Sequence, residues 1–125
     1  MYVILNQPPA EAGLPGIAHA TLAGSSDGLR DISIWQQSVA PGAVTPPHRH
    51  DCEEVVLCTA GNGELHIAGR VERFGPNTTV VIPRNADHQI FSVGSEPLQM
   101  VAVFGMSPVE VYLPDGERLE LPWRS

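Results

Sequence analysis

Residues 42–61 carry the pattern on which the fold assignment rests, and they read G-A-V-T-P-P-H-R-H-D-C-E-E-V-V-L-C-T-A-G. His48 and His50 stand one residue apart, and Glu54 follows four residues after His50. Successive side chains of an extended strand alternate between its two faces, so these three side chains are expected on one side. Two imidazoles and a carboxylate on one surface predict a metal site. Because one strand rarely completes such a site, we expect a fourth ligand from elsewhere, and His88 is the candidate.

The composition indicates a single globular domain without a nucleic-acid or membrane partner. The chain has 125 residues, a one-domain length, and a net charge of −7, which argues against binding to nucleic acid or to an anionic membrane. All seven basic residues are Arg, so Schiff-base chemistry on a lysine is excluded. The N-terminal sequence lacks the basic region of a signal peptide, and no stretch approaches the length of a membrane span. We therefore expect a cytoplasmic protein.

The two cysteines, Cys52 and Cys58, lie on one predicted extended segment and are too far apart along it to form a disulfide without a fold-back. They are expected to be free thiols in a reducing compartment. For each of them, a small buried apolar residue is the commoner role.

The hydrophobic pattern predicts an N-terminal arm followed by strands. Residues 1–28, rich in Pro, Gly, Ala and Ser from residue 7 onward, are expected to form an arm packed on the main domain, with a short strand near residues 17–22. Residues 29–125 form the predicted domain. Short strands are expected at residues 29–40, 53–60, 64–68, 71–74, 78–82, 89–93, 98–104 and 109–113.

Two details of strand register follow from this pattern. In the strand at 29–40, Ile34 and Gln36 share one face, and Trp35 and Gln37 share the other. The turn signal at residues 61–63 predicts a hairpin, in which Cys58 would face Leu65, Val56 would face Ile67 and His66 would pair with Leu57 on the opposite face. Many short strands with turns at even spacing and no helical period predict an all-β sandwich or barrel.

The sequence resembles the cupin superfamily over about residues 30–105. Gly42, His48-x-His50, Glu54 and Gly61 match every specified position of the first cupin motif. A second motif is recognisable in residues 83–88, which end in His88. In this motif Asn85 stands where many members have Gly and Ser92 where many have Asn, and Asn77 occupies the slot of the leading Gly.

The resemblance implies a minimal single-domain cupin, a small double-stranded β-helix or jelly-roll barrel. It also implies that a metal is held inside, near one mouth, by His48, His50, Glu54 and His88, and that the chain forms a homodimer. Independently of the family, three imidazoles and one carboxylate suit one divalent transition metal, namely Fe, Mn, Ni, Co, Cu or Zn. In a six-coordinate metal these four ligands leave two positions open, as is typical of catalytic sites.

Two main classes of function are compatible with this site, and a metal-binding domain that mainly stabilises an assembly is a third alternative. The first is a metal-dependent enzyme acting on a small molecule. A dioxygenase acting on a small oxygenated substrate is preferred within it, and an isomerase, decarboxylase or lyase is the rival reading. The second is a non-enzymatic cupin that binds a small ligand. No second acid/base pair stands out away from the motif, which favours chemistry driven by the metal.

Other residues near the motif are weaker candidates. Gln36 is the polar residue first considered for substrate contact, although a polar outer edge is an equal alternative. Trp35, Phe91 and Trp123 could line a ligand pocket, with core packing as the leading explanation. His19 and His66 are expected to be packing or surface residues outside the metal site, and Arg84 and Asp87 to form a surface ion pair near the mouth.

Overall fold

The computed structural model describes residues 2–125, which fold into two antiparallel sheets and one short 3-10 helix. No helix in this part of the chain has the length and hydropathy needed to cross a bilayer. The elements are β1 (Ala10–Glu11), β2 (Ile17–Ala23), η1 (Ser25–Asp27), β3 (Ser33–Val39), β4 (Glu54–Ala60), β5 (Gly63–Ile67), β6 (Arg70–Phe74), β7 (Thr78–Ile82), β8 (His88–Ser92) and β9 (Leu98–Phe104).

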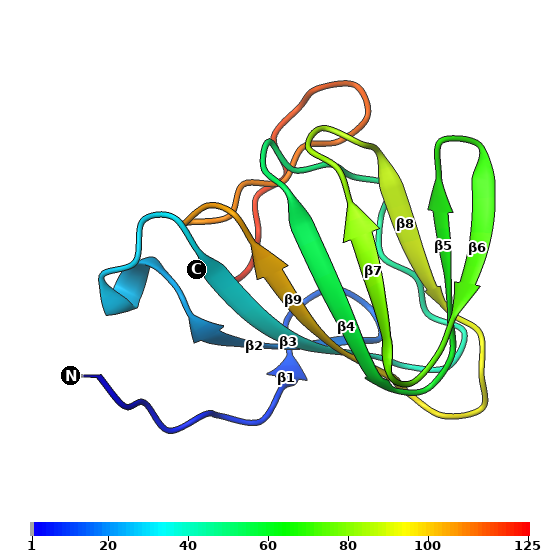
Figure 1. Cartoon of the computed structure of the whole chain (residues 1–125), viewed down its shortest axis with the longest axis horizontal. Coiled ribbons are helices and arrows are strands. Elements are labelled where there is room, and N and C mark those ends of the chain that lie inside the picture. The colour runs from blue at the N-terminus through cyan, green and yellow to red at the C-terminus, as the bar shows by residue number, and fades with distance from the viewer. Residues whose placement is uncertain (1) are drawn as a thin grey trace.

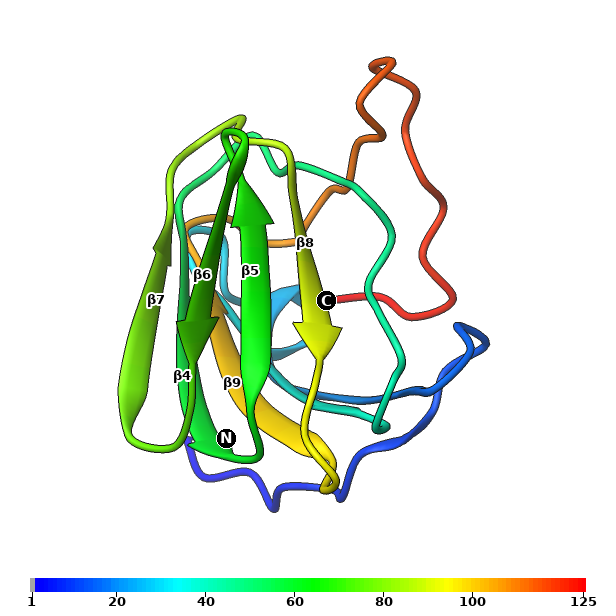
Figure 2. The same ribbon diagram turned by 90° about the vertical axis from the view of Figure 1, so that its right-hand side faces the viewer.

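The two sheets face each other across the core (Figures 1 and 2). The larger has six strands in the order β1-β2-β3-β9-β4-β7, and the smaller has three in the order β6-β5-β8. Neighbouring strands in both sheets run antiparallel. The predicted all-β class is confirmed, and the predicted bounds of the strands at 78–82 and 98–104 match β7 and β9.

Strand alternation places the core between the sheets. In β9, Leu98, Met100, Ala102 and Phe104 are buried, and the residues between them are partly exposed. In β4 the buried series begins with Glu54 and continues with apolar side chains two residues apart. The periodicity that buries the core therefore also carries a carboxylate into the interior of the barrel.

The predicted hairpin between the strands at 53–60 and 64–68 is wrong. β4 pairs with β7 and β9, whereas β5 pairs with β6 and β8, so the two strands belong to different sheets. The chain changes sheet at Gly61, whose φ is 80° and where a Cβ would lie 2.4 Å from the carbonyl oxygen of Pro97. This close approach requires glycine and takes the chain out of the first sheet.

The pairs predicted from that hairpin are corrected accordingly. Cys58 lies opposite Thr78 and Met100 rather than Leu65, and Val56 lies opposite Val80 and Ala102 rather than Ile67. His66 lies opposite Val71 and Gln89 rather than Leu57.

Two departures from the cupin motifs have a backbone explanation. Asn77 and Asn85 have φ values of 64° and 62°. Asparagine tolerates this left-handed region better than most residues with a side chain, so it replaces glycine at these turns. The turn at Asn85 is also fixed to the first motif, because the Asn85 backbone N–H donates to the carbonyl oxygen of His50 at 2.8 Å.

The predicted strand at 109–113 is absent. Tyr112 forms isolated bridges with Arg49 and with Arg118, and no strand follows β9 in the described chain. The segment after β9, orange to red in Figures 1 and 2, runs irregularly beside the connection between β3 and β4. Its Val109 and Val111 side chains are nevertheless buried. We call residues 105–125 the C-terminal segment.

The N-terminal region is only partly an arm. β2 is an integral strand of the six-stranded sheet and pairs with β3 along its length. The short β1 pairs with β2, and residues 2–8 are exposed. Residue 1 of the predicted arm lies outside the described residues.

Candidate metal centre

Three histidines converge inside one end of the barrel. His48 and His50 come from the connection between β3 and β4, and His88 is the first residue of β8. One ring nitrogen from each lies within 4.8 Å of those of the other two. The backbones of His48 and His88 are joined by two hydrogen bonds of 3.1 and 2.9 Å, which bring the two motifs together.

The convergence does not depend on a regular strand through the motif. β4 begins only at Glu54, and residues 51 and 52 before it form a bend. His50 and Glu54 nevertheless both point inward, and their side chains are 2% and 7% exposed. The prediction that these residues share one side holds, although its assumption of a continuous strand does not.

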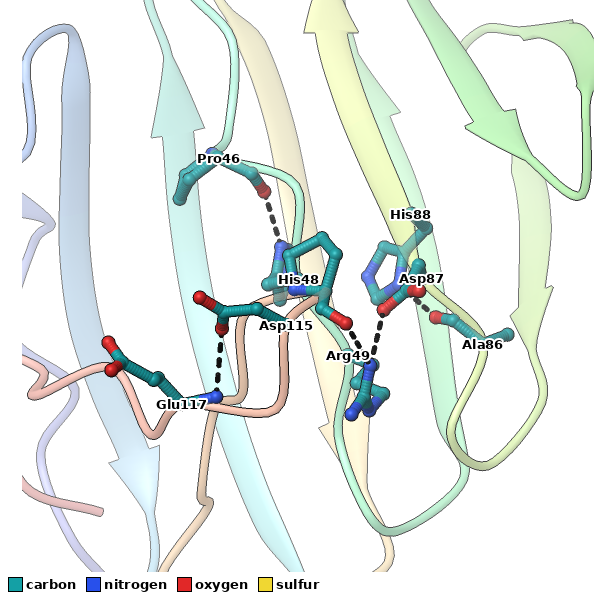
Figure 3. Close-up of polar contacts among 9 residues, drawn as sticks. Pro46, His48, Arg49, Ala86, Asp87, His88, Asp115 and Glu117 are labelled. Carbon is teal, nitrogen blue, oxygen red and sulfur yellow. Dashed lines mark hydrogen bonds and ion pairs between the residues drawn. The ribbon is translucent and has the colours of Figure 1, made fainter.

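Each histidine ring is oriented by a backbone carbonyl. The Nδ1–H of His48 donates to Pro46 O at 2.6 Å, that of His50 to Glu110 O at 2.8 Å and that of His88 to Ala86 O at 2.9 Å. Figure 3 shows the His48 and His88 interactions. A neutral imidazole that donates through Nδ1 has its lone pair on Nε2. All three rings therefore present an unprotonated Nε2, the form that binds a metal.

Glu54 completes the cluster with a buried carboxylate. Its Oε1 lies 3.4 Å from the Nε2 atoms of both His50 and His88. Neither Glu54 Oε1 nor His88 Nε2 has a hydrogen-bond partner among the described residues. With the histidine protons on Nδ1, these atoms are all acceptors facing one another. Such an arrangement is unfavourable unless a cation lies between them.

The pKa shifts in the cluster also indicate neutral His48 and His50 beside a charged carboxylate, a combination that favours a bound cation. Burial lowers the pKa of His48 to about 4, with the neighbouring His88 and His50 adding to the shift, and burial also lowers the pKa of His50. Burial would raise the pKa of Glu54, but its contact with His88 and the nearby histidines outweigh it and lower that pKa. Burial would lower the pKa of His88, but Glu54 raises it. Without a metal, His88 is thus the residue most inclined to take up a proton.

The donor set suits a divalent transition metal. Three imidazole nitrogens with one carboxylate oxygen is a ligand combination that Fe, Mn, Ni, Co, Cu and Zn all accept. The set fits because its rings are already oriented and its acceptor atoms lack partners.

Two adjoining cavities meet at the histidines. The inner one lies within the barrel, and the outer one lies at its mouth and is partly open to solvent; each has a cavity volume of about 40 Å³. Both are lined by Trp35, Gln37, Thr45, His48 and His50. The inner cavity adds Glu54, His88 and core residues. The outer cavity adds apolar side chains from three parts of the chain, namely Leu14, Ile17, Pro46, Val111, Leu119, Leu121 and Trp123.

Aromatic rings form one wall of the outer cavity. Trp35 and Trp123 meet at 90° with their centroids 5.2 Å apart, and Trp35 also packs on Phe104 at 4.4 Å. Trp123 stacks on His19 at 3.9 Å. Of the three aromatic residues considered from the sequence, Trp35 and Trp123 line this cavity. Phe91 instead packs on His66 at 4.1 Å, on the smaller sheet.

Gln37, rather than the Gln36 considered from the sequence, lines the two cavities. Gln36 lies on the opposite face of β3 from Trp35 and is not among the residues that line either cavity. The sequence pattern placed Gln37 with Trp35 correctly but did not show which face was inward. The nearly complete burial of Trp35 and Val39 settles that choice.

The remaining residues named from the sequence lie outside the cluster. His66 contacts Glu64 at 3.2 Å, and Asp87 pairs with Arg49 at 3.1 Å rather than with Arg84 (Figure 3). The thiols of Cys52 and Cys58 are free and buried, and burial raises the pKa of Cys52 to about 11. They are packing residues in the protonated form.

The sequence matches one protein family along almost its whole length. The family model described as auxin binding protein matches residues 2–122. Auxin-binding protein 1 of Arabidopsis thaliana is 37% identical over 120 residues, covering 88% of this chain and 61% of that protein. Auxin-binding protein T85 of Nicotiana tabacum is 38% identical over 120 residues, covering 86% of this chain and 64% of that protein. The chain thus spans less than two thirds of the length of these relatives.

Solved structures confirm the jelly-roll barrel. A cupin 2 domain-containing protein from Halorhodospira halophila superposes with a TM-score of 0.68 at 26% identity, covering 85% of this chain and 68% of its own. An oxalate oxidase superposes with a TM-score of 0.70 at 26% identity, covering 79% and 56%. The polyketide cyclase RemF from Streptomyces resistomycificus gives a TM-score of 0.69 at 23% identity, covering 94% and 78%.

Proposed function

The chain belongs to the auxin-binding protein family, a cupin family, and from this premise we propose that it binds a small organic acid at a metal ion. The metal would be held by His48, His50, Glu54 and His88, as the sequence predicts. A divalent ion at that position supplies a Lewis-acidic site for a carboxylate group. The residues around it then determine which acid is accepted.

The single observation that carries this proposal is the shared wall of the two cavities. His48 and His50 belong to the metal cluster and also line the outer cavity, whose other lining residues are mostly apolar or aromatic. A ligand with a carboxylate at one end and an apolar ring at the other would satisfy both environments at once. Auxins such as indole-3-acetate are molecules of this kind.

The protein's own side chains would bind and orient such a ligand. Trp35 and Trp123 offer ring faces and edges at right angles, which suits a flat aromatic body. Burial lowers the pKa values of His48 and His50 and so holds both rings in the neutral form near neutral pH. The lone pair on each Nε2 therefore remains available to bind the metal. The apolar lining would exclude water from the carboxylate and strengthen its attraction to the cation.

Calorimetric titration with two matched probes tests the proposal. Indole-3-acetate carries a carboxylate, and indole-3-ethanol keeps the ring but replaces the carboxylate with an uncharged hydroxyl. We expect the metal-loaded protein to bind the acid much more tightly than the alcohol. Removal of the metal with a chelator should abolish that difference. Equal affinities for the two probes, or an unchanged preference without metal, would contradict the proposal.

A metal-dependent enzyme, with a dioxygenase as the preferred class, remains the second candidate. The likeness to an oxalate oxidase supports it. Among the described residues that line the two cavities, Glu54 and the three histidines are the only titratable ones, and all four are predicted metal ligands. An isomerase, decarboxylase or lyase that needs a separate general base is therefore less well supported. Oxygen uptake on addition of small diketones, catechols or keto acids would favour the oxygenase.

We also propose the homodimer that the resemblance implies, and assign it to the outer face of the six-stranded sheet. Val55 lies opposite both Val81 and Val103, and Leu57 lies opposite Val101. Val81 is 69% exposed and Leu57 is 41% exposed. β-branched and apolar side chains in adjacent strands form a flat apolar surface, and a second copy of the chain would cover the same surface on both subunits.

A further inference from the structure

Four consecutive apolar residues at the start of the described chain are left exposed to water. Tyr2, Val3 and Leu5 are 104%, 84% and 83% exposed, and Ile4 is 44% exposed. They belong to residues 2–8, which we call the N-terminal tail. The tail carries no charged side chain and runs clear of both sheets (Figures 1 and 2). A run of exposed apolar residues of this length is unfavourable in a soluble domain unless another surface covers it.

The tail has the composition of a strand but no strand beside it. Tyr2, Val3 and Ile4 are aromatic or β-branched, the classes that favour extended structure. Pro8 and Pro9 follow at its base, and a proline keeps both itself and the residue before it out of the helical region. The first strand of the described chain, β1, begins only after these prolines. The tail is therefore extended and available for pairing.

One edge of the six-stranded sheet is open to such a strand. β7 is the last strand of that sheet, and β4 is its only neighbour in the described chain. Its sequence, T-T-V-V-I, has neither a charge nor a proline, the features that normally protect an exposed edge from pairing. Figure 2 shows β7 at the margin of the barrel.

The other three strand edges are protected. β1 is only two residues long, and β6 reads R-V-E-R-F, with three charges. The backbone of residues 42–48 covers the free side of β8 with hydrogen bonds. Among the described strands, β7 alone thus presents an unprotected edge.

We propose that the N-terminal tail of one copy of the chain pairs with β7 of a second copy, so that two copies exchange their tails. Four strands separate β7 from β1, where the tail leaves the sheet, and this order favours pairing between copies over pairing within one chain. An added strand satisfies the open backbone groups of β7. The inference rests on the homodimer proposed above and adds the segment that joins its two copies.

The side chains of the tail would extend the surface already assigned to the homodimer. Val3 and Leu5 are two residues apart, so they lie on one face of a strand. With that face outward, they continue the apolar outer face of the six-stranded sheet, on which Leu57 and Val81 are exposed. Pairing at the edge and packing on the face then form one continuous interface.

The area involved is sufficient for a stable dimer only if the exchange is reciprocal. From the exposed fractions of its four apolar residues, each tail can bury on the order of 500 Å². Two tails and the surfaces that they cover would bury roughly 2,000 Å², whereas one tail would supply about half of this. Stable, specific interfaces begin at about 1,200 Å².

Cross-linking between two single-cysteine variants tests the pairing. Val3→Cys places a thiol on the tail and Thr79→Cys places one on β7, while the native Cys52 and Cys58 are buried. After co-expression of the two variants, a short bismaleimide should give a covalent dimer that contains one chain of each. Val71→Cys, at an exposed position of β6, is the control partner for Val3→Cys. Equal yields with Thr79→Cys and Val71→Cys would overturn the proposal.

A charge in the tail tests its contribution to the dimer. Leu5→Asp should raise the dissociation constant of the dimer at least about tenfold in sedimentation velocity. Val93→Asp, the same kind of change at an exposed position after β8, should leave it within about twofold. A Leu5→Asp variant that dimerises as the wild type does would overturn the tail exchange but leave the homodimer in place. A wild-type protein that is monomeric would overturn both.

Backbone pairing has a signature that side-chain packing alone lacks. Amide hydrogens in residues 3–6 should exchange at least about tenfold more slowly in the wild-type dimer than in Leu5→Asp at the same concentration. Equal exchange rates would show that the tail forms no strand with β7 and would overturn the proposal. These measurements need neither metal nor ligand, so failure of the proposed ligand binding would not change their outcome.

Discussion

The Nδ1–H of His50 donates to the carbonyl oxygen of Glu110 at 2.8 Å, so a predicted metal ligand is oriented by a segment that follows the last strand. The same C-terminal segment supplies Val111, Leu121 and Trp123 to the outer cavity. A change in the position of this segment would therefore alter both the ligand pocket and the metal donor. Binding of metal and binding of ligand should be coupled through it.

The first prediction concerns the residue that fastens this segment to the metal-binding loop. Arg49 donates from Nη1 to Asp87 Oδ1 at 3.1 Å and to the carbonyl oxygen of Pro114 at 3.2 Å. Arg49→Met should loosen the C-terminal segment and lower metal affinity by about tenfold, as expected for loss of support around a ligand. Competition with a chromophoric chelator measures the affinity.

Arg118→Met is the matched control. Arg118 pairs with Glu110 and Glu120 on the exposed surface of the same segment. Surface ion pairs of this kind contribute little, so metal affinity should stay within about twofold of the wild type. Equal losses in the two variants would show that Arg49 acts only through its charge.

The second prediction compares two adjacent glutamates. Glu54 is buried against His50 and His88, whereas Glu53 is exposed. Glu54→Gln removes the anionic donor while keeping the shape of the side chain, and it should lower metal affinity by at least about tenfold. Glu53→Gln removes the same charge from the chain and should leave affinity nearly unchanged. Similar affinities in the two variants would contradict the assignment of Glu54 as a ligand.

The spacing of the first motif was sufficient to predict this part of the site because it depends on local geometry. His48, His50 and Glu54 are held within seven residues of one another, and strand periodicity carries Glu54 inward with Val56 and Cys58. His88 lies far away in the sequence, but its turn is recognisable by Asn85, which adopts a positive φ in place of glycine. For these residues local sequence and final structure agree.

Sheet membership could not be predicted in the same way. The turn signal at residues 61–63 is real, but whether it forms a hairpin depends on what the flanking strands meet in space. Gly61 packs against the backbone of Pro97, so β4 pairs with β7 and β9 and leaves β5 to the other sheet. This is a contact between distant residues, and no local pattern encodes it.

The outer cavity was missed for a related reason. Val109 and Val111 alternate as a strand would, yet their segment forms isolated bridges and packs across the barrel mouth. Leu119, Leu121 and Trp123 follow no periodicity that indicates a pocket. Gln37 shares a face with Trp35 and Val39, but the other face of that strand carries Ile32 and Ile34, so the sequence alone did not show which face was inward.

The third prediction concerns stability at acidic pH. The pKa of His19 is about 4 in the folded protein, below the ordinary value of 6.5 expected in the unfolded chain. Between pH 6.5 and 4 the unfolded state therefore binds more protons at this site, and the free energy of unfolding should fall as pH falls. The contribution is fully present above pH 6.5 and fully lost below about pH 4.

His19→Phe tests this contribution directly. Phenylalanine keeps a flat ring against Trp123 but cannot bind a proton. Urea denaturation across this pH range should show a shallower decline in the free energy of unfolding for the variant than for the wild type, by up to one bound proton. The same slope in both proteins would mean that His19 titrates equally in the folded and unfolded states.

The fourth prediction concerns the proposed dimer. Val81→Arg places a charge on the apolar outer face of the six-stranded sheet, and it should convert a dimer into a monomer in sedimentation velocity. Val71→Arg is the control, because Val71 is also exposed, at 57%, but lies on the smaller sheet. A wild-type protein that sediments as a monomer, or a Val81→Arg variant that remains a dimer, would contradict the assignment of this face.

The most direct test of the account is the metal content of single alanine variants at all five histidines, measured by elemental analysis after purification under identical conditions. His48→Ala, His50→Ala and His88→Ala should each lose most of the metal bound by the wild type. His19→Ala and His66→Ala should retain it, because their rings bond to Thr21 and Glu64 outside the cluster. Full occupancy in His88→Ala, or loss of metal in His66→Ala comparable to that in His50→Ala, would contradict a metal centre formed by these three rings.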